Sequence, residues 1–249
     1  INLFIDSLPF SLTKGQQSAI DDINQSLQSL NPAKFLIQGD VGCGKTIVAL
    51  LACFNVVKNG YQCLVLVPTE VLCNQHFDTF KTYLGSLVNV VSLSGKDSKD
   101  KKADIKKQLK SGAISVLICT HAILHDDYLF NNLALVIIDE QHKFGVKQRE
   151  KITSNHERQP HIIHMSATPI PRTLALVLYE NMKYVKISDR PNNRLETITK
   201  IFNSNQRQSV YDAVNNHLRH NTQVYWVCTR VEDNDDNQKS IKSFHEVIR

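Results

Sequence analysis

The residues with the clearest potential for chemistry form one short loop, Gly39-Asp40-Val41-Gly42-Cys43-Gly44-Lys45-Thr46. Their spacing is that of a phosphate-binding loop, G-x-x-x-x-G-K-[ST], and the loop lies between an apolar run and a helix-like stretch, as this motif requires. Its glycines permit a tight turn that presents backbone N–H groups to phosphate oxygens, and the following helix adds the positive end of its dipole. We expect Lys45 to bind the β- and γ-phosphates of a nucleoside triphosphate and Thr46 to hold Mg²⁺.

A pair of carboxylates, Asp139 and Glu140, directly follows the apolar run at residues 133–138. Adjacent carboxylates at the end of a buried strand are costly unless a cation neutralises them, and Mg²⁺ beside a triphosphate would do so. We expect Asp139 to hold the metal. Because successive strand residues alternate, Glu140 should point differently and act as general base on the attacking water. The loop and the acidic pair together predict a nucleoside-triphosphate hydrolase.

Alternating strands and helices must position these residues. The predicted strands are apolar on successive residues and cover residues 34–38, 63–67, 88–93, 115–119, 133–138 and 162–165, and the predicted helices cover 47–57, 72–83, 101–110 and 172–179. Continuous apolar runs indicate strands buried on both faces, and strands separated by helices need crossover connections. We therefore predict an α/β fold with a mostly parallel sheet and helices on both faces. Ligands bind such sheets at the carboxyl ends of the strands, where nearly all the motifs lie.

A polar segment at residues 189–195 contains Pro191 and predicts a linker. It would separate a first domain, residues 1–188, from the incomplete start of a second α/β unit at 196–249. In that unit we expect strands at 196–202 and 223–228 and a helix at 209–218. The chain does not begin with Met and stops within a helix-like stretch, so we expect it to be a piece of a longer protein.

Composition excludes several classes of protein. The chain has 249 residues, of which 42% are hydrophobic and 21% charged, which is typical of a globular protein. The net charge of +5 permits a nucleic-acid partner without requiring one. No apolar run is long enough to span a membrane. The six cysteines contain no Cys-x-x-Cys and favour a reduced, cytosolic setting over disulfides or zinc. The segment 96–110, with seven Lys and three Asp, is either a solvated helix face or a phosphate-facing patch.

The acidic pair belongs to a D-E-x-H box, Asp139-Glu140-Gln141-His142, and with it the sequence resembles the superfamily-two helicases. The resemblance implies ATP and Mg²⁺ as cofactors and two RecA-like lobes, of which residues 1–188 would be the ATP-binding lobe. It also implies that Gln141, His142 and the segment Ser166-Ala167-Thr168 couple the γ-phosphate site to movement between the lobes. Small hydroxyl side chains suit such a relay because they exchange hydrogen-bond partners easily.

The same resemblance assigns adenine recognition to Gln16, with Phe10 as the aromatic residue near the base. Three further loops each close an apolar run, and the resemblance implies that they contact the backbone of the nucleic-acid strand. These loops are Pro68-Thr69-Glu70, Ser94-Gly95 and Thr120-His121.

Longer blocks, at residues 8–13, 38–42, 137–146, 165–175 and 224–228, are similar to the RecG family of bacterial branched-DNA helicases. Cys43 departs from the Ser that is common in this family, and we expect only its backbone to matter. Lys143 stands where Arg is usual, which keeps the charge but loses the planar fork of donors.

The RecG resemblance implies an ATP-dependent helicase or double-stranded-DNA translocase that remodels stalled replication forks and Holliday-type junctions in DNA repair and recombination. It implies a bacterial cytoplasmic protein associated with the nucleoid, with branched double-stranded DNA as partner. The wedge domain and the rest of the second lobe lie outside this chain, so we expect the piece alone to bind nucleotide but hydrolyse it poorly. The alternatives are the translocase module of a transcription-repair coupling factor, an RNA-directed helicase, and an inactive nucleotide-dependent scaffold.

Overall fold

The computed structural model describes residues 2–29, 31–120, 128–140, 159–168, 182–189, 197–220 and 222–227. The chain divides into two compact units, Ile1–Arg194 and Leu195–Arg249. The helix predicted at 172–179 lies outside the described residues. Within these residues, no helix combines the length and the apolar character needed to cross a bilayer.

The first unit alternates strands and helices along the chain. Its helices are α1 (Asn2–Asp6), α2 (Lys14–Leu27), α3 (Lys45–Lys58), α4 (Glu70–Leu84) and α5 (Lys99–Ser111). Its strands are β1 (Lys34–Gly39), β2 (Gln62–Leu66), β3 (Val90–Leu93), β4 (Val116–Cys119), β5 (Leu133–Asp139), β6 (His161–Ser166) and β7 (Met182–Ile187). All six strands predicted from the apolar runs are present.

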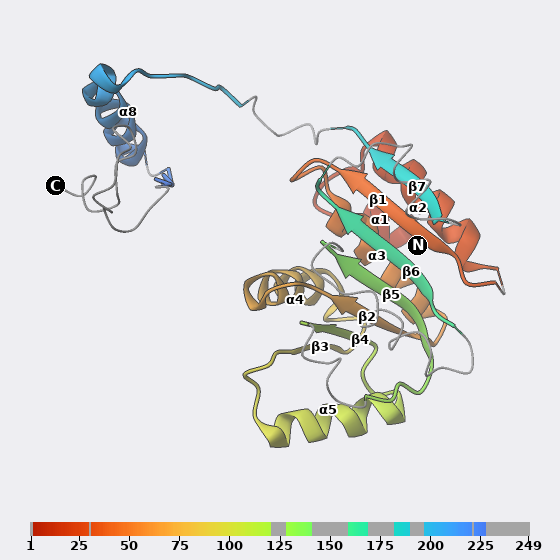
Figure 1. The fold of residues 1–249 in the computed structure, drawn as a ribbon. Helices are drawn as coiled ribbons and strands as arrows, with labels where there is room; N and C mark the ends of the chain where they lie inside the picture. The colour runs from red at the N-terminus through yellow and green to blue at the C-terminus, as the bar shows by residue number, and fades with distance from the viewer. Residues whose placement is uncertain are drawn as a thin grey trace. The chain divides into compact units, whose positions relative to one another are not determined.

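The strands form one seven-stranded sheet in the order β3-β4-β2-β5-β6-β1-β7 (Figure 1). Every neighbouring pair is parallel, so the predicted mostly parallel sheet is parallel throughout the described strands. All these strands therefore end at one edge of the sheet, which gathers the loops that follow them.

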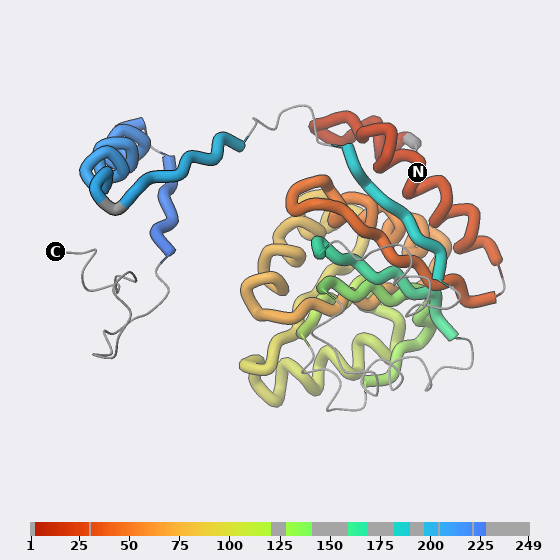
Figure 2. Tube along the Cα trace, turned by 45° about the horizontal axis from the view of Figure 1, so that its top comes forward, coloured from red at the N-terminus to blue at the C-terminus, as the bar shows by residue number. Residues whose placement is uncertain are grey.

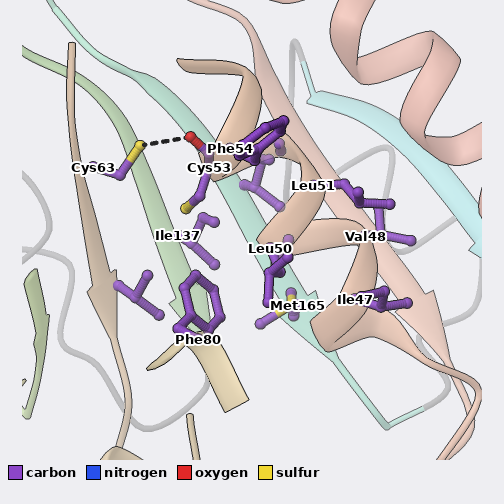
Figure 3. Packing of buried hydrophobic residues seen from close by; sticks show 14 of the residues in the cluster. Ile47, Val48, Leu50, Leu51, Cys53, Phe54, Cys63, Phe80, Ile137 and Met165 are labelled. Carbon is purple, nitrogen blue, oxygen red and sulfur yellow. Dashed lines mark hydrogen bonds between the residues drawn. The ribbon is translucent and has the colours of Figure 1, made fainter. Parts of the chain in front are cut away.

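Helices cover both faces of the sheet, as predicted. On β2, Cys63 and Val65 pack with α2, α3 and α4, whereas Leu64 and Leu66 pack on the opposite face with α5. Figure 3 shows the larger core, in which Leu50 and Phe54 of α3 lie near Ile137 of β5. Alternate strand residues thus fill two separate cores, which explains why the strands are apolar on successive residues.

Helices α4 and α5 begin two residues before the predicted stretches because polar residues cap them. Thr69 caps α4 by accepting a hydrogen bond from the Leu72 backbone N–H, and Ser98 caps α5 in the same way. Gly112 ends α5 in the left-handed conformation. The capping residues are polar and carry no apolar signal, so the hydrophobic pattern alone places the start of these two helices too late.

The strand β7 was not predicted. It lies at the β1 edge of the sheet, where α2 packs against it (Figure 2). Only Ile187 of its residues is fully buried, and Lys183 and Lys186 interrupt the apolar pattern. An edge strand of this kind lacks the continuous apolar run that marks the central strands.

The second unit contains η3 (Ser204–Gln206) and α8 (Arg207–Arg219), which confirms the helix predicted at 209–218. The strands predicted at 196–202 and 223–228 are wrong for the described residues of both segments, which carry no strand. A strand needs a ladder partner, and an extended apolar sequence alone does not supply one. Instead, Trp226 stacks on Tyr211 of α8, with 5.5 Å between the ring centroids.

Candidate nucleotide-binding site

The phosphate loop joins the end of β1 to the start of α3, as its motif requires. Gly39 is the last residue of β1, and Lys45 is the first residue of α3. Gly42 and Gly44 have φ angles of 79° and 88°, a left-handed conformation that glycine adopts without steric cost. The N-terminus of α3 is therefore aimed at the loop, where a phosphate would bind.

The Lys45 ammonium lies over this loop. Its Nζ donates hydrogen bonds to the carbonyl oxygens of Gly39, at 2.7 Å, and Asp40, at 3.0 Å. An ammonium has three N–H donors, so these bonds leave one for a phosphate oxygen. Thr46 follows in the first turn of α3, where it is half-buried.

Gln16 supports the phosphate loop through a buried hydrogen bond to its backbone. It is 4% exposed, and its Nε2 donates to the Cys43 carbonyl oxygen at 2.8 Å. Its Oε1 accepts from the Thr13 backbone N–H at 2.9 Å, which completes a capping box at the start of α2. The contacts of this amide are thus with the chain itself, and its role toward adenine stays a prediction. Phe10, also assigned to adenine, is 41% exposed and meets the Tyr83 ring edge-on.

The side chain of Cys43 contributes to packing, and its role in phosphate binding stays a prediction. It is 2% exposed and belongs to the larger core. A Cβ on Gly39 would collide with Cys43 Sγ and would lie 2.8 Å from the Ile187 carbonyl oxygen. The loop therefore packs tightly against β1 and β7.

Asp139 ends β5 at the same sheet edge as the phosphate loop. In the strand register, Asp139 pairs with Met165 of β6, and Met165 pairs with Ile37 of β1. Strands β5 and β1 are thus separated by β6, so their backbones lie about 10 Å apart, or two strand spacings. A magnesium–triphosphate complex could span this separation, whereas a direct contact between Lys45 and Asp139 is not needed.

Glu140 turns away from the strand for a reason that strand alternation did not predict. Its φ is 51°, a left-handed conformation that is uncommon for residues other than glycine. Its backbone N–H donates to the Met165 carbonyl oxygen at 3.0 Å, which holds the turn against β6. The conformation costs about 1 kcal/mol or more, and such strained residues cluster at active sites.

His76 of α4 is a site residue that sequence reasoning missed. Its Nε2 lies 3.0 Å from Asp139 Oδ2, and the residue is 4% exposed. A signal for it exists, because Cys73, His76, Phe80 and Leu84 are the buried residues of α4 and follow a helical spacing. A histidine within an otherwise apolar stripe marks a buried polar group that needs a partner.

The predicted coupling segment is hydrogen-bonded within itself and to β1. Ser166 Oγ and Thr168 Oγ1 are 2.8 Å apart, with Ala167 between them in the chain. Gln38 Nε2 donates to the Thr168 carbonyl oxygen at 2.6 Å, and Gln38 Oε1 accepts from the Tyr184 hydroxyl. Neither Gln38 nor Tyr184 was predicted as a site residue. Gln141 and His142 lie outside the described residues.

The predicted DNA-backbone loops follow the neighbouring strands β2, β3 and β4. Pro68, Thr69 and Glu70 follow β2, Ser94 and Gly95 follow β3, and Thr120 follows β4. Two of the loops are joined by an ion pair of 2.5 Å between Lys96 Nζ and Glu70 Oε2, which raises the pKa of Lys96. Thr120 is buried, which limits its reach toward a ligand. His121 lies outside the described residues.

The lysine-rich segment forms most of α5. Four of its lysines, at positions 99, 102, 106 and 110, share one side of the helix by their spacing. Lys102 Nζ donates to the Gly95 carbonyl oxygen at 2.9 Å, and Lys106 lies over the Tyr128 ring at 4.9 Å. This row of lysines therefore runs from the predicted DNA loop at Ser94-Gly95 along α5, which packs on the smaller core. Whether the row is a solvated helix face or a phosphate-facing patch stays a prediction.

Comparisons with known proteins agree with this geometry. The model of the DEAD/DEAH box helicase family matches residues 13–177. The chain is 44% identical to an ATP-dependent DNA helicase RecG of Aquifex aeolicus and 37% identical to one of Synechocystis, in each case over 93% of the chain. It spans only 29% and 28% of the length of those proteins.

Among solved structures, the chain resembles RecG bound to a three-way DNA junction. The two share 36% sequence identity with a TM-score of 0.77, over 88% of this chain and 29% of that one. The predicted resemblance to RecG helicases and the RecA-like fold are confirmed, and nucleotide use accords with both. The chain belongs to the DEAD/DEAH box helicase family.

Proposed function

We propose that this chain is the ATP-binding lobe and the start of the second lobe of a RecG-type, ATP-dependent DNA helicase or double-stranded-DNA translocase. The observation that carries this proposal is the gathering of the phosphate loop, Asp139, Glu140 and the coupling segment at one sheet edge. Supporting it, the relatives at 44% and 37% identity are named ATP-dependent DNA helicases.

In this proposal, residues 1–188 form the first lobe, 189–195 the linker and 196–249 the start of the second lobe. Asp189, at the start of the linker, accepts a hydrogen bond from the Gly15 backbone N–H at 2.7 Å. The linker would therefore leave the first lobe next to the N-terminus of α2, where Gly15 directly precedes Gln16 of the proposed nucleotide site.

The donor groups present fit a magnesium ion. Asp139 supplies a carboxylate and Thr46 a hydroxyl, both of them hard oxygen ligands at the same sheet edge. These two residues would hold the ion, which would neutralise charge on the bound phosphates. Lys45 and the loop N–H groups would orient the β- and γ-phosphates, and the Glu140 carboxylate would accept a proton from the attacking water.

The proposed partner is branched double-stranded DNA, including stalled forks and Holliday-type junctions, in repair and recombination. The loops after β2, β3 and β4 would contact its phosphate backbone, where small hydroxyls and backbone N–H groups suffice. A cytoplasmic, nucleoid-associated location in bacteria goes with this partner. Relatives bearing the RecG name and the structure of RecG with a three-way junction support DNA over RNA.

The piece alone should bind nucleotide but hydrolyse it poorly. A second lobe is expected to supply an arginine to the γ-phosphate, and such an arginine is worth about 10³–10⁵ in rate. Brisk DNA-stimulated phosphate release by these 249 residues would contradict this part of the proposal.

The test of the proposed function is Lys45→Ala in the full-length protein. Removing the ammonium should abolish ATP hydrolysis stimulated by fork DNA, measured as phosphate release. Lys34→Ala is the matched control, because Lys34 is exposed at the opposite end of β1 and should leave turnover unchanged. Retained turnover in Lys45→Ala would show that the loop is misassigned, and stimulation by RNA but not fork DNA would refute the DNA partner.

A further inference from the structure

The buried imidazole of His76 contacts the acid proposed to hold the metal and lies tilted against the Phe80 ring, with 6.4 Å between the ring centroids. His76 Nε2 lies 3.0 Å from Asp139 Oδ2. Its other nitrogen, Nδ1, is buried and has no hydrogen-bond partner among the described residues. A bond to a carboxylate requires the proton on Nε2, so the Asp139 contact also selects the tautomer of a neutral ring.

This arrangement is a poor way to stabilise the fold. A buried polar group costs free energy unless its atoms are paired, and here one of the two ring nitrogens is not. The neighbouring residues of the same stripe, Cys73 and Phe80, show that the position faces an apolar environment that a Leu would also fill. The benefit of a histidine here therefore lies in what it does to Asp139.

The benefit to Asp139 is orientation. A terminal carboxylate on a strand can rotate about its side-chain bonds, and a hydrogen bond to one oxygen restricts this rotation. Residues that orient metal ligands in this way typically change metal affinity or activity 10–100-fold when they are removed.

Helix α4 also connects this contact to the proposed DNA surface. It begins at Glu70, within the loop after β2, and His76 lies six residues later, about 9 Å along the helix axis. The Lys96–Glu70 ion pair ties the same first turn to the loop after β3. A displacement of α4 when DNA binds would thus move the group that holds Asp139.

We propose that His76 is a positioning residue that holds the Asp139 carboxylate for Mg²⁺–nucleotide binding and makes this site responsive to DNA through α4. The proposal rests on the proposed function, since it takes Asp139 as the metal-binding acid and the loop after β2 as a DNA contact.

The sharpest test compares His76→Asn with His76→Gln in the full-length protein. The Gln Nε2 reaches nearly as far as the imidazole Nε2, whereas the shorter Asn amide does not, so the pair differs in reach rather than in polarity. We expect His76→Asn to raise the Mg²⁺ concentration for half-maximal binding of a fluorescent ATP analogue about 10–100-fold. His76→Gln should restore it to within a few-fold of the wild type. The same shift should appear in the Mg²⁺ dependence of ATP turnover. At saturating Mg²⁺ the turnover of His76→Asn without DNA should return to the wild-type rate, whereas its stimulation by fork DNA should stay altered.

Cys73→Ala is the control, because it disturbs the same buried face of α4 one turn earlier without contacting Asp139. It should leave the Mg²⁺ dependence unchanged. Equal Mg²⁺ dependence in His76→Asn, His76→Gln and the wild type would overturn the positioning role, while wild-type turnover would still uphold the proposed function. A shift in His76→Asn with unchanged stimulation by fork DNA at saturating Mg²⁺ would refute the link through α4. Failure of the wild type itself to bind or hydrolyse ATP would instead refute the proposed function.

Discussion

Replacing Gly44 with alanine tests how tightly Gln16 supports the phosphate loop. The backbone of Gly44 has a φ of 88°, and a Cβ there would overlap Gln16 Nε2 and lie 3.3 Å from Gln16 Cδ. Gln16 is buried and hydrogen-bonded at both ends of its amide, to Cys43 and Thr13, so it cannot move aside without losing these bonds.

The expected loss of stability has two parts. A left-handed conformation costs alanine about 1 kcal/mol more than glycine. Displacing Gln16 breaks two hydrogen bonds, each worth about 1 kcal/mol. The total is about 3 kcal/mol, which corresponds to a decrease in Tm of about 9 °C for a domain of this size.

Gly60→Ala is the matched control. Gly60 has a similar φ of 82°, but a Cβ there would meet no described atom within 4 Å. It should lose only the conformational part, about 1 kcal/mol and about 3 °C in Tm. Thermal unfolding of both variants separates the two contributions.

A double-mutant cycle then identifies Gln16 as the cause. In a Gln16→Ala background the overlapping amide is absent, so adding Gly44→Ala should cost only about as much as Gly60→Ala. The reasoning is refuted if Gly44→Ala destabilises no more than Gly60→Ala. It is also refuted if Gln16→Ala leaves the cost of Gly44→Ala unchanged.

Two further predictions concern buried groups. Tyr184→Phe removes the hydroxyl that donates to Gln38 Oε1, and leaving this buried acceptor unpaired should lower the free energy of unfolding by about 1–3 kcal/mol in urea denaturation. Tyr61→Phe, at a position 39% exposed, is the control, and equal losses in both variants would contradict the prediction. Burial raises the pKa of the Cys73 thiol from 9.0 to about 11. Because this folded pKa lies above the unfolded one, the thiol's contribution to stability is present below pH 9 and is lost as the pH rises toward 11. Denaturation midpoints across this range should decline less steeply in Cys73→Ala, and parallel declines would count against the prediction.

Much of the fold could be predicted because local signals and tertiary structure agree. The central strands are apolar on successive residues, since Leu64 and Val65 of β2 face different cores. The phosphate loop is encoded within eight adjacent residues, so the sequence identifies it without knowledge of the Gln16 and β7 contacts that support it. Where burial is one-sided, as in β7, the apolar run disappears and the prediction failed.

The unpredicted features of the site are contacts between distant residues. His76 and Asp139 are 63 positions apart, and Gln38 and Tyr184 are 146 apart. The sequence identifies a histidine in an apolar stripe, but its partner depends on which strand α4 packs against. The turn at Glu140 is likewise held by β6, through the Met165 carbonyl oxygen.

Strand order is the physical reason for this limit. Apolar runs predict that strands exist, but nothing in them requires β6 to lie between β1 and β5. That placement sets Ser166 beside Gln38 in the strand register and puts the coupling segment between the phosphate loop and the acidic pair. Gln38 then bonds Thr168 on one side and Tyr184 on the other, so a single buried amide connects β1, β7 and the coupling segment. A change at the phosphate loop, one residue from Gln38, can therefore reach Thr168 through one side chain.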